Sequence, residues 1–63
     1  MNKKYPDGYI PKIKYWITKL HEADKAGDLH AKSRAVGKIA GFTQAHIDRY
    51  GPIPPGALEI DNP

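Results

Sequence analysis

The chain has 63 residues and no cysteine, so neither disulfide bonds nor thiolate metal sites reinforce its fold. A formal net charge of +3 and a pI near 9.3 permit nucleic acid or an acidic protein as partner without requiring either. No run approaches the roughly 20 apolar residues of a membrane span, and the basic N-terminus lacks the apolar stretch of a signal peptide. We therefore expect one small cytoplasmic domain, which needs tight helix packing or oligomerisation for stability.

Residues 1–10 are predicted to form an arm that contains a turn. The turn is indicated by Pro6, whose ring presets φ, and by the Asp7-Gly8 pair that follows it. Pro11 then indicates the start of a helix, because the N–H that proline lacks would have no intrahelical partner at that position.

Apolar residues recur at three- and four-residue steps between residues 11 and 26, which predicts an amphipathic helix. These residues are Ile13, Trp16, Ile17, Leu20 and Ala23. Gly27 favours the left-handed conformation that ends a helix, and Asp28 is a good N-cap for the next helix. The sequence therefore predicts a tight turn between two antiparallel helices.

A second helix is predicted over residues 29–50. The proline and glycine residues that follow are dense enough to exclude regular helix from residues 51–63. We expect this tail to be extended, and it carries the acidic residues Glu59 and Asp61.

The second helix either continues through Gly41 or breaks there. In a continuous helix, the apolar residues form two adjacent rows. The first row consists of Leu29, Val36, Ala40, Thr43, Ile47 and Tyr50. We expect it to cover the first helix, so the second row needs a further partner. That second row is the candidate oligomer interface, formed by Ala35, Ile39, Phe42 and His46. This alternative predicts an all-α antiparallel two-helix hairpin that forms a homodimer, as in a four-helix bundle.

If the helix breaks, residues 37–50 resemble a helix-turn-helix motif and the protein has three helices. Gly37 is then the small residue of the motif, Gly41 makes the turn, and Ile47 anchors the recognition helix. The resemblance implies a DNA-binding transcriptional regulator. The residues that it places toward DNA are Thr43, Gln44 and Arg49. The concentration of lysine in the N-terminal third of the chain, away from this motif, disfavours DNA binding.

No group of residues in the sequence indicates catalysis, a cofactor or a metal site. The histidines, His21, His30 and His46, have no companion at the i+4 spacing that directs two rings to one metal. Ser33 lies one helical turn after His30, but the pair lacks an orienting third group. We therefore expect neither an enzyme nor a small-molecule substrate.

Lys12, Tyr15 and Lys19 form the candidate partner-binding patch. Tyr15 falls on the side of the first helix away from Ile17, so we expect its ring to be exposed. An amphipathic ring among positive charges is typical of protein contacts. We hypothesise that this patch meets the acidic surface of a protein partner.

Three short features resemble the helical-hairpin proteins that phages of Gram-positive bacteria encode. They are the start "KIKYW", the later "KL" and the "GD" junction before the second helix. The resemblance implies an accessory protein that works by contact, such as a regulator or an inhibitor of a host or defence protein. The overall expectation is a non-catalytic protein that binds a macromolecule as a homodimer.

Overall fold

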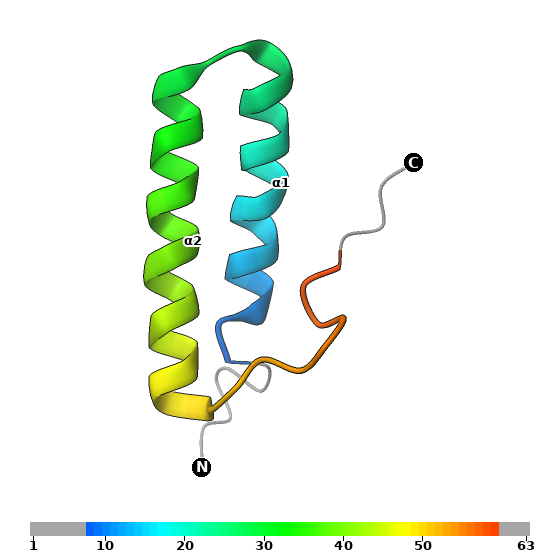
Figure 1. Ribbon diagram of the computed structural model, residues 1–63, viewed down its shortest axis with the longest axis vertical. Helices are drawn as coiled ribbons and strands as arrows, with labels where there is room; N and C mark the ends of the chain where they lie inside the picture. The colour runs from blue at the N-terminus through cyan, green and yellow to red at the C-terminus, as the bar shows by residue number, and fades with distance from the viewer. Residues whose placement is uncertain (1–7, 60–63) are drawn as a thin grey trace.

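The computed structural model describes residues 8–59, which contain two antiparallel helices joined by a tight turn (Figure 1). Helix α1 spans Ile10–Ala26 and helix α2 spans Leu29–Tyr50. The predicted all-α hairpin is confirmed, and the part of the chain that the structure describes contains no strand. Within that part, neither helix combines the length and the apolar character that crossing a membrane requires.

Helix α1 begins one residue before the predicted start. Pro11 occupies its first turn, and the N–H of Ile13 donates to the carbonyl of Tyr9 at 2.9 Å, which closes that turn. Gly8 precedes the helix at a φ of 60°, in the left-handed region that favours glycine. Pro6 and Asp7, which the sequence places in a turn, lie outside the described residues.

The tight turn predicted at Gly27 and Asp28 is present, and its hydrogen bonds are those of a Schellman motif. Gly27 adopts φ 71°, and its N–H donates to the carbonyl of Asp24 at 3.2 Å. The N–H of Asp28 donates to the carbonyl of Ala23 at 3.0 Å. The side chain of Asp28 in turn accepts the N–H of Ala31, which caps α2. Both ends of the turn are therefore satisfied by local hydrogen bonds.

Helix α2 runs without a break through both glycines for 22 residues. The alternative with a third helix after Gly41, and with it the helix-turn-helix geometry, is therefore wrong. The physical reason is that α2 has a buried residue before Gly41, Ala35, and another after it, His46. Packing against α1 on both sides of the glycine outweighs its low helix propensity, because tertiary packing supplies most of a helix's stability.

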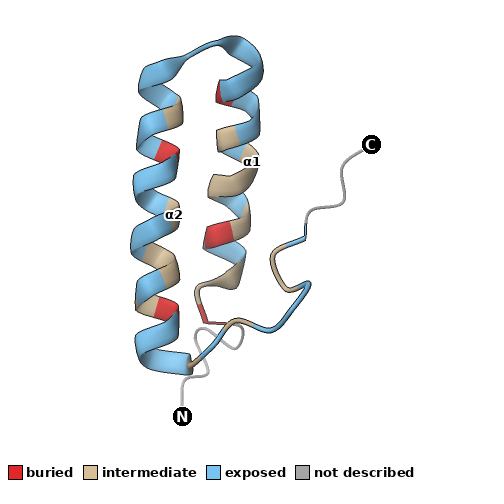
Figure 2. Ribbon diagram, viewed as in Figure 1, coloured by how far each residue is buried: buried red, intermediate tan, exposed pale blue. Residues whose placement is uncertain are grey.

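The core between the helices is small. Within residues 8–59 the buried hydrophobic side chains are those of Ile13, Ala23 and Ala35, and Ile13 is the largest that is fully buried. His46 is buried as well, and the buried positions face the space between the two helices (Figure 2). Ala23 and Ala35 contribute one small buried side chain from each helix, which lets the two backbones approach closely.

The two apolar rows of α2 exchange the roles that the sequence suggested. The row predicted to meet a second chain faces α1: Ala35 and His46 are buried, and Ile39 and Phe42 are half-buried. The other row, predicted to cover α1, is largely exposed. That prediction is therefore wrong. With the Ala35 row toward α1, His46 accepts the Tyr9 N–H at 3.1 Å and the Phe42 ring packs 5.9 Å from the Tyr9 ring.

The C-terminal segment folds back past the start of α1 and runs beside it (Figure 1). Where the sequence predicts an extended tail, residues 54–59 form consecutive turns. The N–H of Ala57 donates to the carbonyl of Pro54 at 3.1 Å, and that of Glu59 donates to the carbonyl of Gly56 at 3.2 Å. These turns leave Ile53, Ala57 and Leu58 half-buried. Asp61 lies outside the described residues.

Candidate interaction surfaces

The open end of the hairpin is closed by a contact between His46 and the start of α1. The backbone N–H of Tyr9 donates to Nδ1 of His46 at 3.1 Å. A neutral imidazole that accepts at Nδ1 carries its proton on Nε2. The His46 ring lies 5.1 Å from the Tyr50 ring between centroids, and the Tyr9 ring lies 6.1 Å from Tyr50. Gly8 is required here, because a Cβ would lie 2.5 Å from the His46 ring.

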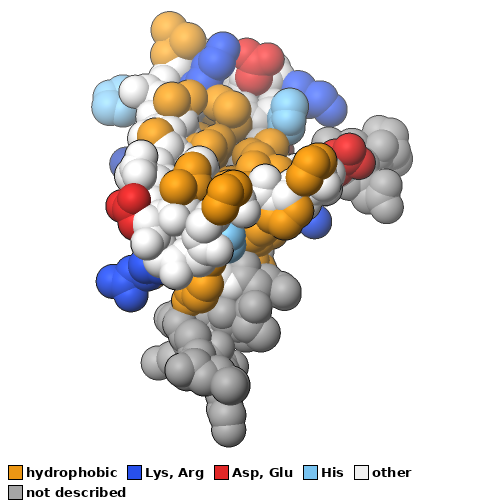
Figure 3. Space-filling model, turned by 60° about the horizontal axis from the view of Figure 1, so that its bottom comes forward, with side chains coloured by type: hydrophobic (Ala, Val, Ile, Leu, Met, Phe, Trp, Pro, Cys, Tyr) orange, Lys and Arg blue, Asp and Glu red, His pale blue; other side chains and the backbone are white. Residues whose placement is uncertain are grey.

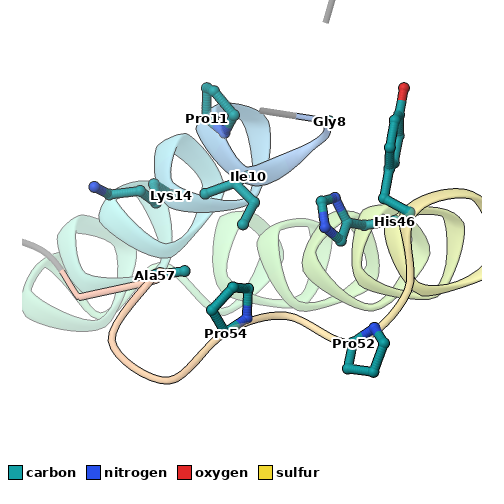
Figure 4. Close-up of a pocket in the computed structure, with 9 residues that line it drawn as sticks. Gly8, Ile10, Pro11, Lys14, His46, Pro52, Pro54 and Ala57 are labelled. Carbon is teal, nitrogen blue, oxygen red and sulfur yellow. The ribbon is translucent and has the colours of Figure 1, made fainter. Parts of the chain in front are cut away.

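A cleft of about 710 Å³ opens beside this contact, between the start of α1, the end of α2 and the C-terminal segment (Figure 4). Its wall is largely apolar and includes Ile10, Pro54 and Ala57. The His46 ring points toward Gly8 and Ile10, whereas the Lys14 side chain extends away from the imidazole (Figure 4). The cleft thus contains an imidazole with one nitrogen already engaged and no serine, threonine or cysteine beside it.

The exposed row of α2 forms what we call the apolar face, defined by Leu29, Val36, Ala40 and Ile47. Leu29 is 75% exposed, Val36 50% and Ile47 43%. Hydrophobic side chains gather on one side of the molecule over both helices and the C-terminal segment (Figure 3). The spacing of seven, four and seven residues within the apolar face is that of a coiled-coil seam.

An ion pair joins the two helices near the turn. Nζ of Lys32 lies 2.7 Å from Oδ1 of Asp24. The hydrogen bond from Lys32, together with its positive charge, lowers the pKa of Asp24. Both side chains are substantially solvent-accessible, so the pair adds little to stability.

The predicted patch is part of a larger surface, which we call the basic aromatic face. Its residues are Lys12, Tyr15, Trp16, Lys19, Lys38 and Phe42. As predicted, Tyr15 is exposed, with 54% of its surface accessible. Its ring meets Trp16 edge-to-face with centroids 5.3 Å apart. Nζ of Lys19 lies 5.5 Å from the centre of the Tyr15 ring, and Nζ of Lys38 lies 5.9 Å from that of Trp16. Lys19 also pairs with Glu22 at 3.5 Å.

Two hollows on this face share Phe42 as a wall. The first, of about 370 Å³, is lined by Pro11, Lys12, Tyr15, Trp16 and Phe42. The second, of about 400 Å³, is lined by Tyr9, Gly37, Lys38, Gly41, Phe42 and Ala45. We call the two hollows together the Phe42 groove. The rings of Tyr9 and Phe42 lie 5.9 Å apart, so the start of α1 supports one side of this groove.

The residues predicted to face DNA do not form a common surface. Successive positions on a continuous helix turn by about 100°, so Thr43, Gln44 and Arg49 point in different directions. Thr43 is half-buried, and Nε2 of Gln44 donates to Oδ1 of Asp48 at 2.9 Å. The prediction of a recognition helix fails because the helix has no break to present one.

The sequence reasoning missed the contribution of α2 to the basic aromatic face. Lys38 and Phe42 are four residues apart and therefore lie on one side of α2, and this spacing is visible in the sequence. Whether Lys38 and Phe42 lie beside Trp16 depends on which row of α2 faces α1, and the sequence does not indicate this. No group of three or more histidine, cysteine or acidic residues that could hold a metal ion occurs within the described residues.

Comparison with known proteins gives no further constraint, because the chain matches no family model, no curated protein and no solved structure. The resemblance to phage hairpin proteins therefore stays a prediction.

Proposed function

We propose that the protein is a small non-catalytic binding protein that works as a homodimer, with its apolar face buried between the two copies. The observation that carries this proposal is the exposure of Leu29, Val36 and Ile47 beside a core in which Ile13 is the largest fully buried side chain. Large exposed apolar side chains aligned along one side of a helix are typical of interaction sites.

The pattern of the apolar face favours a helical hairpin as the occupant. Its heptad-like spacing suits another helix packed along the length of α2. Ala40 lies near the middle of α2, where a small side chain lets two crossing helices approach closely. Two hairpins stacked in this way form a four-helix bundle, the arrangement expected from the sequence, but through the other apolar row of α2.

Catalysis at the cleft is disfavoured because the His46 imidazole already takes part in a structural hydrogen bond. Its Nδ1 already accepts the Tyr9 N–H, and that bond is part of the fold. The function we infer is therefore contact with macromolecules. The resemblance to phage proteins favours a regulatory or inhibitory role for the dimer.

Sedimentation equilibrium tests this proposal. We expect the wild-type chain to sediment at twice its 7.0 kDa mass. The double variant Val36→Gln/Ile47→Gln should weaken self-association at least about a hundredfold, because a two-fold interface loses each apolar side chain twice. Glutamine keeps helix propensity, so circular dichroism should be unchanged. The matched control is Tyr15→Gln, an equally exposed position on the other face. A wild-type monomer, or equal dimerisation of the two variants, would contradict the proposal.

A further inference from the structure

We propose that the Phe42 groove binds an acidic protein segment that carries a large apolar side chain. The sequence indicates a small basic patch, but the groove adds a defined shape and a second helix. Its two hollows lie on either side of Phe42, so one bound segment can contact α1 and α2 at once.

Positive charge surrounds the groove. Lys12 lines the first hollow, Lys38 lines the second, and Lys19 lies against the Tyr15 ring. Arg34 lies four residues before Lys38, and Arg49 lies seven residues after Phe42, so both fall on this side of α2. Two acidic residues lie on the same side: Glu22, which pairs with Lys19, and Asp48, which is seven residues after Gly41 and accepts a hydrogen bond from Gln44, so positive charge remains in excess. This charge complements a ligand with several carboxylates.

The positions of the ammonium groups distinguish a carboxylate ligand from a nucleic acid. Proteins that bind single strands stack bases on the open faces of aromatic rings. Here Lys19 lies over the Tyr15 ring and Lys38 lies over the Trp16 ring. A base that stacks on the ring face covered by a lysine would have to displace that cation, whereas a carboxylate can pair with both cations in their present positions.

The apolar part of the groove sets the second requirement for the ligand. Pro11, Trp16 and Phe42 line the first hollow, and its volume of about 370 Å³ admits a leucine or phenylalanine side chain. Gly37, Gly41 and Ala45 leave the second hollow open along α2. A Cβ at Gly41 would meet no atom within 4 Å beyond its immediate chain neighbours, so the space directly over Gly41 is open.

This proposal stands apart from self-association. Val36 of the apolar face and Lys38 of the groove are two residues apart on α2, which places them about 200° apart around the helix axis. A dimer formed through the apolar face therefore leaves the groove accessible, and a monomer would present the same groove.

The test measures fluorescence anisotropy of a fluorescein-labelled peptide in which Leu-Phe is flanked on both sides by glutamates. Two control peptides separate the requirements: one has glutamine for every glutamate, and the other has Gly-Gly for Leu-Phe. We expect the first peptide to bind and each control peptide to bind at least about tenfold more weakly. Added salt should weaken binding of the first peptide.

Protein variants locate the site. Lys12→Gln/Lys38→Gln should lower affinity about tenfold, whereas Lys14→Gln/Lys25→Gln, which removes the same charge elsewhere, should change it less than about twofold. Gly41→Leu fills the second hollow and improves helix propensity, so it should lower affinity without lowering stability. The dimer-deficient Val36→Gln/Ile47→Gln variant should bind the peptide as the wild type does.

The proposal is overturned if the acidic peptide does not bind, or if its glutamine analogue binds equally well. It is also overturned if oligo-dT displaces the peptide and binds more tightly in a manner that depends on Lys12 and Lys38. In that case the surface is one for nucleic acid.

Discussion

The backbone N–H of Tyr9 donates a hydrogen bond to Nδ1 of His46 over 3.1 Å and joins the start of α1 to the end of α2. The ring is buried there, and it also contacts Tyr50. His46→Ala removes both the acceptor and the packing, and it leaves the Tyr9 N–H without its partner. We expect a loss of about 2–3 kcal/mol in the free energy of unfolding, measured by urea denaturation. His30→Ala, at an exposed position of α2, is the control and should change stability by less than about 0.5 kcal/mol.

Substitution of Gly8 and of Gly27 by alanine distinguishes the stability lost to an unfavourable backbone conformation from the stability lost to a steric clash. Both have positive φ, 60° and 71°. A Cβ at Gly27 meets nothing within 4 Å, whereas one at Gly8 would lie 2.5 Å from the His46 ring. Gly27→Ala should therefore cost about 1–2 kcal/mol. Gly8→Ala should cost at least about 1 kcal/mol more, because the ring must move. Equal losses in chemical denaturation would show that the Gly8 contact with His46 is not formed in solution.

Gly37 and Gly41 lie in the interior of α2 and, unlike Gly8, face open space. Alanine at either position should raise the free energy of unfolding by up to about 1 kcal/mol, because alanine favours helix. Thermal denaturation followed by circular dichroism measures this effect. Destabilisation by both substitutions would mean that another chain packs against the glycines, in conflict with a dimer formed through Val36 and Ile47.

The pair of Asp24 and Lys32 gives a pH dependence of known sign. Lys32 lowers the pKa of Asp24 in the folded protein. The pair therefore contributes stability above the pH at which an unfolded aspartate titrates, about 4, and loses it as pH falls through the lower folded pKa. Asp24→Asn should be slightly less stable than the wild type at pH 7 and equal to it in strong acid. Denaturation midpoints across this range measure the difference, and Lys32→Gln should reproduce it. A difference that persists in strong acid would contradict the assignment.

The effect of replacing Phe42 depends on whether its ring packs within the hairpin or in the dimer interface. Its ring packs near Tyr9 and lines the hollow that also contains Trp16. Phe42→Ala should therefore destabilise each hairpin by about 2–3 kcal/mol and leave the dimer mass unchanged. Sedimentation and urea denaturation of this variant test both parts. If the variant dissociates the dimer and leaves hairpin stability unchanged, the dimer interface contains Phe42, as the sequence predicts.

The features of the fold that local signals encode are predictable from the sequence. Pro11 indicates the start of α1, and Gly27 with Asp28 predicts the tight turn, the left-handed glycine and the N-cap that the structure contains. The exposure of Tyr15 follows from helical spacing alone. Each of these features depends on residues within one or two helical turns of each other.

Two features required knowledge of packing. The rows that contain Ala35 and Val36 are adjacent and similarly apolar, so periodicity identifies both without indicating which one faces α1. The contacts that distinguish them, those of His46 and Phe42 with Tyr9, involve residues of both ends of the hairpin. The contact of Gly8 and Tyr9 with His46 joins positions far apart in the chain, and no local pattern signals it.

The positions of Val36 and Lys38 on different sides of one continuous helix have a consequence for assembly. A pair of hairpins joined back-to-back at Val36 turns both Lys38 side chains outward, with the Schellman turn at Gly27 fixing α1 and α2 in each hairpin. Such a pair is bivalent. Two weak sites held at a fixed separation would bind a target with repeated acidic segments far more tightly than one site alone. The same holds for two neighbouring targets on one surface. The avidity would then be set by the spacing of the target's segments.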